Sequence, residues 1–551
     1  MMKIFTSLLI LGALVSSLVA QPIPHRAEYA PKEATIIPLS ENWRMDGDIP
    51  TNVLLISLQG LANREAPRVY LEYPTHWQWE TVRPLIKFME RRHGTEFTRI
   101  GLNDADAALA LFAKHAKGYV VWDREVRASA NVAFTASGVL DAVVVSEELI
   151  PLAEKHGLKK VEDLRGIFRG KGDHEIYQWA VDKYWDRTSR DYYVVLGGHA
   201  GMTMQPGVAD FGVMQRAFCA DLSASPKHPE ELALLKDLLG RQNANSTVIG
   251  WHSYGKDTEG QHTTLTGSLG LKMEGLHNLP NVSYTSQIPL TKDFSFKNPG
   301  NLDRGYDKVA KKKIYVAALA TDSMGIGTWT QEGRGEIPYG WQVLMGWVRL
   351  NPVALQFFYE DKTANDYFVG GLSGPGYMYP KSIPVDHFTV LMKDARQLMQ
   401  ALDLEIMEIM DYSEGNRHVG NTDLPKELVD RYYESFPEAI GFINGYGTAR
   451  TFDLRDGVPF ISYDYYLSVD RPIDEAAADL EELTQLNPQR PYFLLMHVRE
   501  RNTVEKVRQI FVLLSEDVEI VPVDVFMKLA ASEKTYRTRF QKPNDPIDLN
   551  H

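Results

Sequence analysis

The chain has 551 residues, too many for one ordinary domain, so we expect two or three domains that each bury a hydrophobic core. Hydrophobic residues make up 44% and charged residues 24%, the composition of a soluble globular protein. The formal net charge of -13 argues against nucleic acid as a partner. Cys219 is the single cysteine, which excludes an intramolecular disulfide and a zinc–thiolate cluster.

Residues 1–20 have the pattern of a secretory signal peptide. Lys3 provides a positive start, residues 4–15 are apolar, and small residues including Ala20 precede an expected cut before Gln21. No later apolar run approaches the length of a membrane span. We therefore predict a secreted or periplasmic protein without a stable membrane span.

Residues 21–305 are predicted to form an N-terminal Rossmann-like α/β domain or set of domains. Helical patterns alternate with short buried strands, which is typical of parallel sheets with helices on both faces. A helix is expected over 53–60, and a polar loop over 252–268. The expected strands cover 68–72, 119–122, 142–145, 192–196 and a run ending near 251.

Residues 306–551 are predicted to form a barrel-like catalytic domain, after a basic, Pro/Gly/Asn-containing linker over 298–313. Repeated strand-then-helix units favour a (β/α)7-8 barrel, and an open doubly wound sheet is the alternative. Seven strands are expected, over 314–320, 353–359, 404–410, 439–443, 458–462, 492–497 and 518–521. Helices are expected over 385–402, 425–435, 473–484, 503–514 and 523–531.

Acidic residues follow most of these expected strands. Because sites in parallel α/β folds lie at the carboxyl ends of the strands, Asp322, Asp411, Asp464 and Glu500 are our candidates for acid/base catalysis. Glycoside hydrolysis needs two carboxyl groups, one as proton donor and one as base or nucleophile, about 5–10 Å apart. The sequence does not indicate which carboxyl group takes which role.

Aromatic and polar residues beside these acids are our candidates for substrate binding, since aromatic faces stack on sugar rings. The loop 323–350 is long, and we expect Trp329 to be exposed in it, whereas Trp341 could equally belong to the core. The complete set is Tyr377, Tyr379, Trp329, Trp341, Glu360, Tyr412, Tyr446 and His497.

Other chemistries have weaker support. Ser373 lies in Gly-Leu-Ser-Gly-Pro, which lacks the last glycine of a nucleophile elbow. Neither a dinucleotide fingerprint nor a Walker loop stands out, so no cofactor is expected. The histidines match no common transition-metal spacing, while a divalent cation held by carboxylates near Asp322 is compatible with the sequence.

The stretch 371–380 reads Gly-Leu-Ser-Gly-Pro-Gly-Tyr-Met-Tyr-Pro, a stiff aromatic loop that follows the expected second strand. Its last seven residues fit Gly-x-Gly-Tyr-x-Tyr-Pro at each fixed position. The chain thus resembles the GxGYxYP family of glycoside hydrolases. Further stretches that look like this family are residues 58–64, 337–341 and 365–368. The resemblance implies an exported bacterial protein that acts in carbohydrate metabolism. The first barrel strand of that family ends in an Asp-Gly-Asp-Asn-like turn, whereas this chain has Asp322-Ser-Met-Gly.

We therefore expect an exported carbohydrate-active hydrolase with a carbohydrate substrate. Because the second acidic position after Asp322 is absent, a non-catalytic glycan-binding or periplasmic scaffold protein is the alternative. A carbohydrate esterase or deacetylase is a third possibility. The sugar, the linkage, the stereochemical outcome and the oligomeric state are not specified by the sequence.

Overall fold

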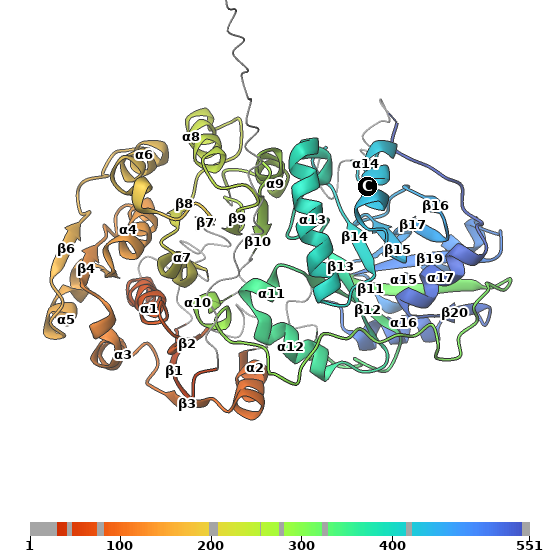
Figure 1. Ribbon diagram of the computed structural model, residues 1–551, viewed down its shortest axis with the longest axis horizontal. Coiled ribbons are helices and arrows are strands. Elements are labelled where there is room, and N and C mark those ends of the chain that lie inside the picture. The colour runs from red at the N-terminus through yellow and green to blue at the C-terminus, as the bar shows by residue number, and fades with distance from the viewer. Residues whose placement is uncertain are drawn as a thin grey trace, which may run out of the picture.

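The computed structural model describes residues 30–40, 47–73, 82–197, 208–253, 255–274, 280–321, 329–414 and 421–542. It is a mixed α/β structure with three small parallel sheets and one long curled sheet. In Figure 1 the small sheets, coloured red to green, lie on the left, and the long sheet, coloured green to blue, lies on the right. Helices α9 and α13 lie at the boundary between the halves.

The first two sheets have three strands each, in the orders β2-β1-β3 and β5-β4-β6. The first contains β1 (Glu33–Pro38), β2 (Val69–Glu72) and β3 (Glu96–Arg99), with helices α1 (Ile49–Ala62), α2 (Val82–Phe88) and α3 (Ala105–Phe112). The second contains β4 (Gly118–Val121), β5 (Ala142–Val145) and β6 (Lys160–Asp163), with α4 (Arg127–Leu140), α5 (Ile150–Lys155) and α6 (Asp173–Tyr184).

The third sheet has the order β10-β9-β7-β8. Its strands are β7 (Tyr192–Val195), β8 (Phe218–Ala220), β9 (Thr247–Gly250) and β10 (Lys272–Glu274). Its helices are α7 (Ala209–Gln215), α8 (Pro229–Gly240), α9 (Glu259–Ser268) and α10 (Val282–Thr285). Helix α9 lies in the stretch 252–268, so the expectation of a continuous loop there was wrong; a Thr258–Gln261 capping box begins the helix.

Helix α1 packs against β2 of the first sheet, β5 of the second sheet and helix α7, which accompanies the third. It is apolar on all sides, and nearly all of its residues are buried, as expected for a helix inside a core. At its end Arg64 donates to the backbone oxygens of Gly138 and Val213, 3.0 and 2.8 Å away, and to the carboxylate of Asp141. The expected helix over 53–60 is therefore confirmed, and the residues that follow it join neighbouring parts of the fold.

The long sheet runs β16-β17-β15-β14-β13-β12-β11-β19-β18, and β20 pairs with β11. Its strands are β11 (Ile314–Thr321), β12 (Tyr339–Leu344), β13 (Asp366–Gly371), β14 (Ile406–Ile409), β15 (Gly441–Asn444), β16 (Asp453–Arg455), β17 (Val458–Ser462), β18 (Tyr465–Leu467), β19 (Tyr492–Arg499) and β20 (Val518–Ile520). Its helices are α11 (Trp347–Leu350), α12 (Pro352–Asp361), α13 (Val385–Ala401), α14 (Lys426–Ser435), α15 (Ile473–Leu486), α16 (Val504–Val512) and α17 (Val523–Ser532).

The long sheet is curled into a half-barrel. Strand β18 stands at one end of its path and β17 stands next to the other end, yet only Tyr463 and Asp464 separate them along the chain. The Tyr463 amide donates to Asn444 O at 3.1 Å, and the Asp464 amide donates to Leu495 O at 3.0 Å. Helix α17 contacts both β11 and β17 and packs on the concave face, where it buries an apolar cluster.

Two expectations for this half were wrong. Residues 353–359 belong to helix α12 instead of a strand, and Glu360 therefore lies near a helix end. The stretch 323–350, expected as a loop, contains β12 and α11. The strands expected around 314–320, 404–410, 439–443, 458–462, 492–497 and 518–521 are all present, with ends shifted by a few residues.

Candidate active site

Side-chain alternation places polar groups inside the carboxyl end of the long sheet. The side chains of Leu319, Val369, Ile406, Ile443, Ile461 and Leu495 pack with α17 in one cluster. Residues two positions further along a strand point to the same face. On β11, β14 and β19, just after β17, and on β12 beside β11, the residue at that next position is polar and fully buried. These residues are Thr321, Gln342, Glu408, Tyr463 and His497, here called the polar layer.

Glu408 is the carboxylate of the polar layer. The Tyr463 hydroxyl donates to Glu408 Oε1 at 2.7 Å, and the Gln342 amide donates to Glu408 Oε2. Gly371 leaves the room for this contact, because a Cβ there would lie 2.5 Å from Gln342 Cγ. Side chains from β12 and from the end of β17 thus hold both oxygens of the Glu408 carboxylate.

His497 is the imidazole of the polar layer. Its Nε2 is hydrogen-bonded to Thr321 Oγ1, and burial lowers its pKa to about 3, so the ring is neutral at ordinary pH. Its Nδ1 has no hydrogen-bond partner among the described residues. Tyr466 stacks on the ring at 4.9 Å, and Tyr446 lies 4.3 Å away.

An unbroken series of aromatic rings leads from the polar layer to the third sheet. The ring centroids lie 6.0 Å apart for Tyr446–Tyr412, 6.0 Å for Tyr412–Tyr379, 5.6 Å for Tyr379–Tyr377 and 5.0 Å for Tyr377–Trp251. We call these five rings the aromatic row. Glu259 of α9 lies at its far end, where it accepts hydrogen bonds from the hydroxyls of Tyr377 and Tyr379.

The loop 371–380 therefore crosses from the long sheet to the third sheet. Tyr377 exchanges backbone hydrogen bonds of 2.8 and 3.0 Å with Met273 of β10. A Cβ at Gly376 would lie 3.0 Å from Met273 O, so the third glycine of the loop permits this close approach. Ser373 is used structurally: its Oγ lies 2.8 Å from Met410 O and 3.0 Å from Met410 N.

Four buried charged residues and one buried amide surround this crossing. We call them the seam network: Asn245, Lys272, Glu274, Arg349 and Asp394. Arg349 donates two hydrogen bonds to Asp394, at 2.9 and 2.5 Å, and Asn245 donates to Asp394 at 3.1 Å. Lys272 donates to Asn245 Oδ1 at 2.7 Å. Burial lowers the pKa of Lys272 to about 7 and raises the pKa of Glu274 to about 8.

Three of the four expected catalytic carboxylates lie in the described part of the chain, each with its own partners. Asp322 lies outside the described residues. Asp411 accepts from the backbone amides of Lys381 and Ser413 at 2.7 and 2.9 Å, and burial raises its pKa. Asp464 accepts from the Leu495 amide at 3.2 Å, and burial raises its pKa to about 7. Glu500 follows β19 and pairs with Arg499, whose guanidinium lies 5.4 Å from the Tyr446 ring centroid.

The expected binding residues divide into two groups. Tyr377, Tyr379, Tyr412, Tyr446 and His497 lie in the aromatic row or the polar layer, all buried. The other three lie elsewhere. Trp329 is 1% exposed and donates to Asp361 at 2.9 Å, so the expectation that it is exposed was wrong. Trp341 is buried beside Trp329, and Glu360 pairs with Arg92 at 2.9 Å.

Sequence reasoning missed Gln342, Glu408 and Tyr463. Glu408 carried a usable signal, since it is a single acid in the apolar run Ile406–Met410, where an unpaired charge is costly. Within the described ranges no group of three His, Cys, Asp or Glu side chains could hold a metal ion. No described helix is long and apolar enough to cross a membrane.

Comparison with known proteins agrees with this architecture. One solved structure, described as "Crystal structure of a putative hydrolase from Bacteroides thetaiotaomicron", superposes with a TM-score of 0.74 at 18% identity, over 93% of this chain and 97% of that chain. At this identity the likeness shows the fold alone. No curated protein matches the chain.

Family profiles match most of the sequence. Those described as "GxGYxYP_N 1st domain", "GxGYxYP_N second domain" and "GxGYxYP third domain" match residues 35–114, 116–188 and 190–287. The one described as "GxGYxYP putative glycoside hydrolase C-terminal domain" matches residues 312–531. The chain therefore belongs to the GxGYxYP family.

Proposed function

We propose that the protein is an exported glycoside hydrolase that acts at the carboxyl end of the long sheet. In finer detail, we propose that this sheet serves as a (β/α)7-8 barrel and that the Rossmann-like N-terminal part covers its mouth. The observation that carries the proposal is the position of Glu408, a buried carboxylate fixed by Gln342 and Tyr463 beside the aromatic row. The family's description as glycoside hydrolase supports the reaction class.

Glycosidic cleavage needs one carboxyl group that gives a proton and one that takes a proton or attacks the sugar. We propose Glu408 as one of the pair, because its two neutral hydrogen-bond donors hold it in a fixed orientation. Glu500, beside Arg499 and Tyr446, is our first choice for the partner, and Asp322, which follows Thr321 directly, is our second. Asp411 and Asp464 would then have structural roles, since backbone amides bind their carboxylates.

The aromatic row would bind the sugar chain. Aromatic side chains supply large flat surfaces with polar tips, which suits pyranose rings and their hydroxyls. The tyrosine hydroxyls at the far end are already oriented by Glu259. Because the four tyrosine rings of the row are buried, sugar binding would require that side chains near the mouth move apart.

The test is turnover of a panel of aryl glycosides and polysaccharides by the wild type and by Glu408→Gln, Glu500→Gln and Asp322→Asn. Loss of turnover in Glu408→Gln and one of the other two, with unchanged folding, supports the proposal. Sugar binding without turnover in the wild type would favour the glycan-binding scaffold. Release of acetate without glycosidic cleavage would favour the esterase or deacetylase.

A further inference from the structure

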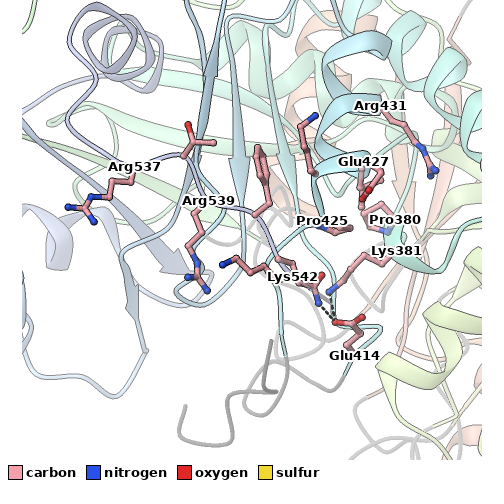
Figure 2. A pocket seen from close by; sticks show the side chains of 14 residues that line it. Pro380, Lys381, Glu414, Pro425, Glu427, Arg431, Arg537, Arg539 and Lys542 are labelled. Atoms are coloured by element: carbon pink, nitrogen blue, oxygen red, sulfur yellow. Dashed lines mark hydrogen bonds and ion pairs between the residues drawn. The ribbon is translucent and has the colours of Figure 1, made fainter. Parts of the chain in front are cut away.

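A groove of about 1360 Å³ lies beside the end of the loop 371–380. One wall is formed by the C-terminal segment 537–542 and the other by residues that precede and begin α14, as Figure 2 shows. Lys381 and Glu414 join the walls and are hydrogen-bonded to each other at 3.1 Å. The groove therefore lies on the same side of the long sheet as the carboxyl ends of β13 and β14.

The groove is basic although the protein carries a net charge of -13. Two acidic side chains, Glu414 and Glu427, line it. The basic side chains that line it are Lys381, Lys426, Arg431, Arg537, Arg539 and Lys542. A cleft lined mainly by one sign of charge raises the local concentration of ligands of the other sign.

Several of these charges are already neutralised within the protein. Lys426 pairs with Asp430 at 2.8 Å, and Arg539 lies 3.6 Å from Asp423. Arg431 and Arg537, in contrast, form no ion pair with any described residue. They lie at opposite ends of the groove in Figure 2, so a ligand that reaches both must be extended.

The groove begins directly after the aromatic row along the chain. Tyr379 of the row is followed directly by Pro380 and Lys381 of the groove wall, and Asp411 holds the Lys381 amide at 2.7 Å. Besides its charges, the groove presents the apolar surfaces of Pro380, Pro425, Leu428 and Phe540. The groove thus lies next to the row along the chain, and it offers a glycan both apolar faces and basic side chains.

We propose that the groove binds acidic units of the glycan, so that the substrate class is an anionic polysaccharide. This inference rests on the proposed function. Arginine guanidinium groups form forked, charge-assisted hydrogen bonds with planar carboxylates and with sulfate oxygens, which neutral sugars do not offer. Carboxylates of uronic acids and sulfate esters share this chemistry, and the experiment distinguishes them.

The experiment measures binding by titration calorimetry with three oligosaccharides of equal length: an oligouronate, a sulfated oligosaccharide and a neutral one. The proteins are the wild type, Arg431→Glu/Arg537→Glu and the control Lys308→Glu, in which the replaced side chain is 70% exposed outside the groove. We expect an anionic oligosaccharide to bind the wild type and the control equally, and the double variant about tenfold or more weakly. The tighter of the two anionic probes identifies the acidic group.

The milder double variant Arg431→Gln/Arg537→Gln gives the same information if charge reversal prevents folding, with a smaller loss expected. Equal affinity for the neutral and anionic probes, or affinity unchanged by both double variants, would overturn the proposal. Equally tight binding of a single-stranded DNA of the same charge would also overturn it, since that result indicates attraction without sugar recognition. Calorimetry measures binding and not turnover. The proposal for the groove can therefore be supported when the proposed glycosidase activity is contradicted, or the reverse.

Discussion

The polar layer and the seam network are both buried and polar, but their partners and positions differ. In the seam network, the Arg349 guanidinium faces the Asp394 carboxylate across two hydrogen bonds. In the polar layer, neutral groups, the Gln342 amide and the Tyr463 hydroxyl, bind the Glu408 carboxylate. The polar layer lies at the carboxyl ends of parallel strands, where sites of α/β folds form, whereas the seam network lies between two parts of the fold.

This difference shows why burial and a displaced pKa do not by themselves identify a site. Lys272 and Glu274 have strongly displaced pKa values, yet Glu274 packs against Gly346 and Gly376 at the crossing between sheets. Ion-pair networks that hold a structure together displace pKa values as catalytic groups do. We therefore expect changes in the polar layer to affect chemistry and changes in the seam network to affect stability.

The largest expected effect is that of Glu408→Gln. If Glu408 takes part in acid/base catalysis, turnover on the best substrate of the panel falls by about 10³-fold, since glutamine cannot transfer the proton. Glu405→Gln, just before the same strand, is the matched control and should retain turnover. Equal turnover of the two variants would remove Glu408 from the mechanism.

Asp394→Ala should produce the largest loss of stability. The change leaves the guanidinium of Arg349, which is 9% exposed, buried without its partner, and we expect a loss of about 3–5 kcal/mol in unfolding free energy. Urea unfolding measures it, with Asp386→Ala in the exposed first turn of the same helix as control. Turnover per folded molecule should be unchanged, and a selective loss of turnover would contradict a purely structural role.

Glu274→Gln should change how stability depends on pH. Burial raises the pKa of Glu274 from 4.5 to about 8, so the folded protein keeps a proton that the unfolded chain has released, and stability falls as pH rises through this window. Between pH 5 and 7 the wild type should thus lose melting temperature relative to Glu274→Gln. The lowered pKa of Lys272 acts in the opposite direction only above about pH 7. Parallel melting curves from pH 5 to 7 would show that Glu274 is ionised in the folded protein.

Tyr377→Phe should have the smallest effect. It removes one hydroxyl that donates to Glu259, while the Tyr379 hydroxyl, at 2.9 Å, still binds the same oxygen. We expect a loss of about 1.5–3 kcal/mol in unfolding free energy, as for one hydrogen bond to a charged group. Denaturant unfolding measures it. A loss as large as that of Asp394→Ala would mean that the row stabilises the fold as strongly as the seam network does.

The sequence predicted most strands of the long sheet because their apolar runs are short and bounded by turns. It failed at Val353–Tyr359, since a short continuous apolar run does not distinguish a buried strand from a buried helix. The cue was just upstream: Asn351 caps the helix through Ala354 N, and Pro352 occupies its first turn. β12 was missed because its glycine and glutamine weaken the strand pattern.

The candidate site was predicted less completely than the fold. The expected catalytic residues follow strand ends. Glu408 and Gln342, in contrast, lie inside strands, and they become neighbours only in the folded sheet. The curl depends on the path of the whole sheet, which local sequence does not specify. The loop 371–380 was correctly placed after a strand, although that strand is β13, and its contact with the third sheet could not be read from spacing alone.

The most direct test is a crystal structure of Glu408→Gln with an oligosaccharide identified in the panel. We predict a sugar ring within hydrogen-bonding distance of residue 408, with neighbouring units stacked along Tyr412 and Tyr446. Sugar found only at a surface remote from the polar layer, with residue 408 still enclosed by Gln342 and Tyr463, would contradict the proposal that this layer is the active site.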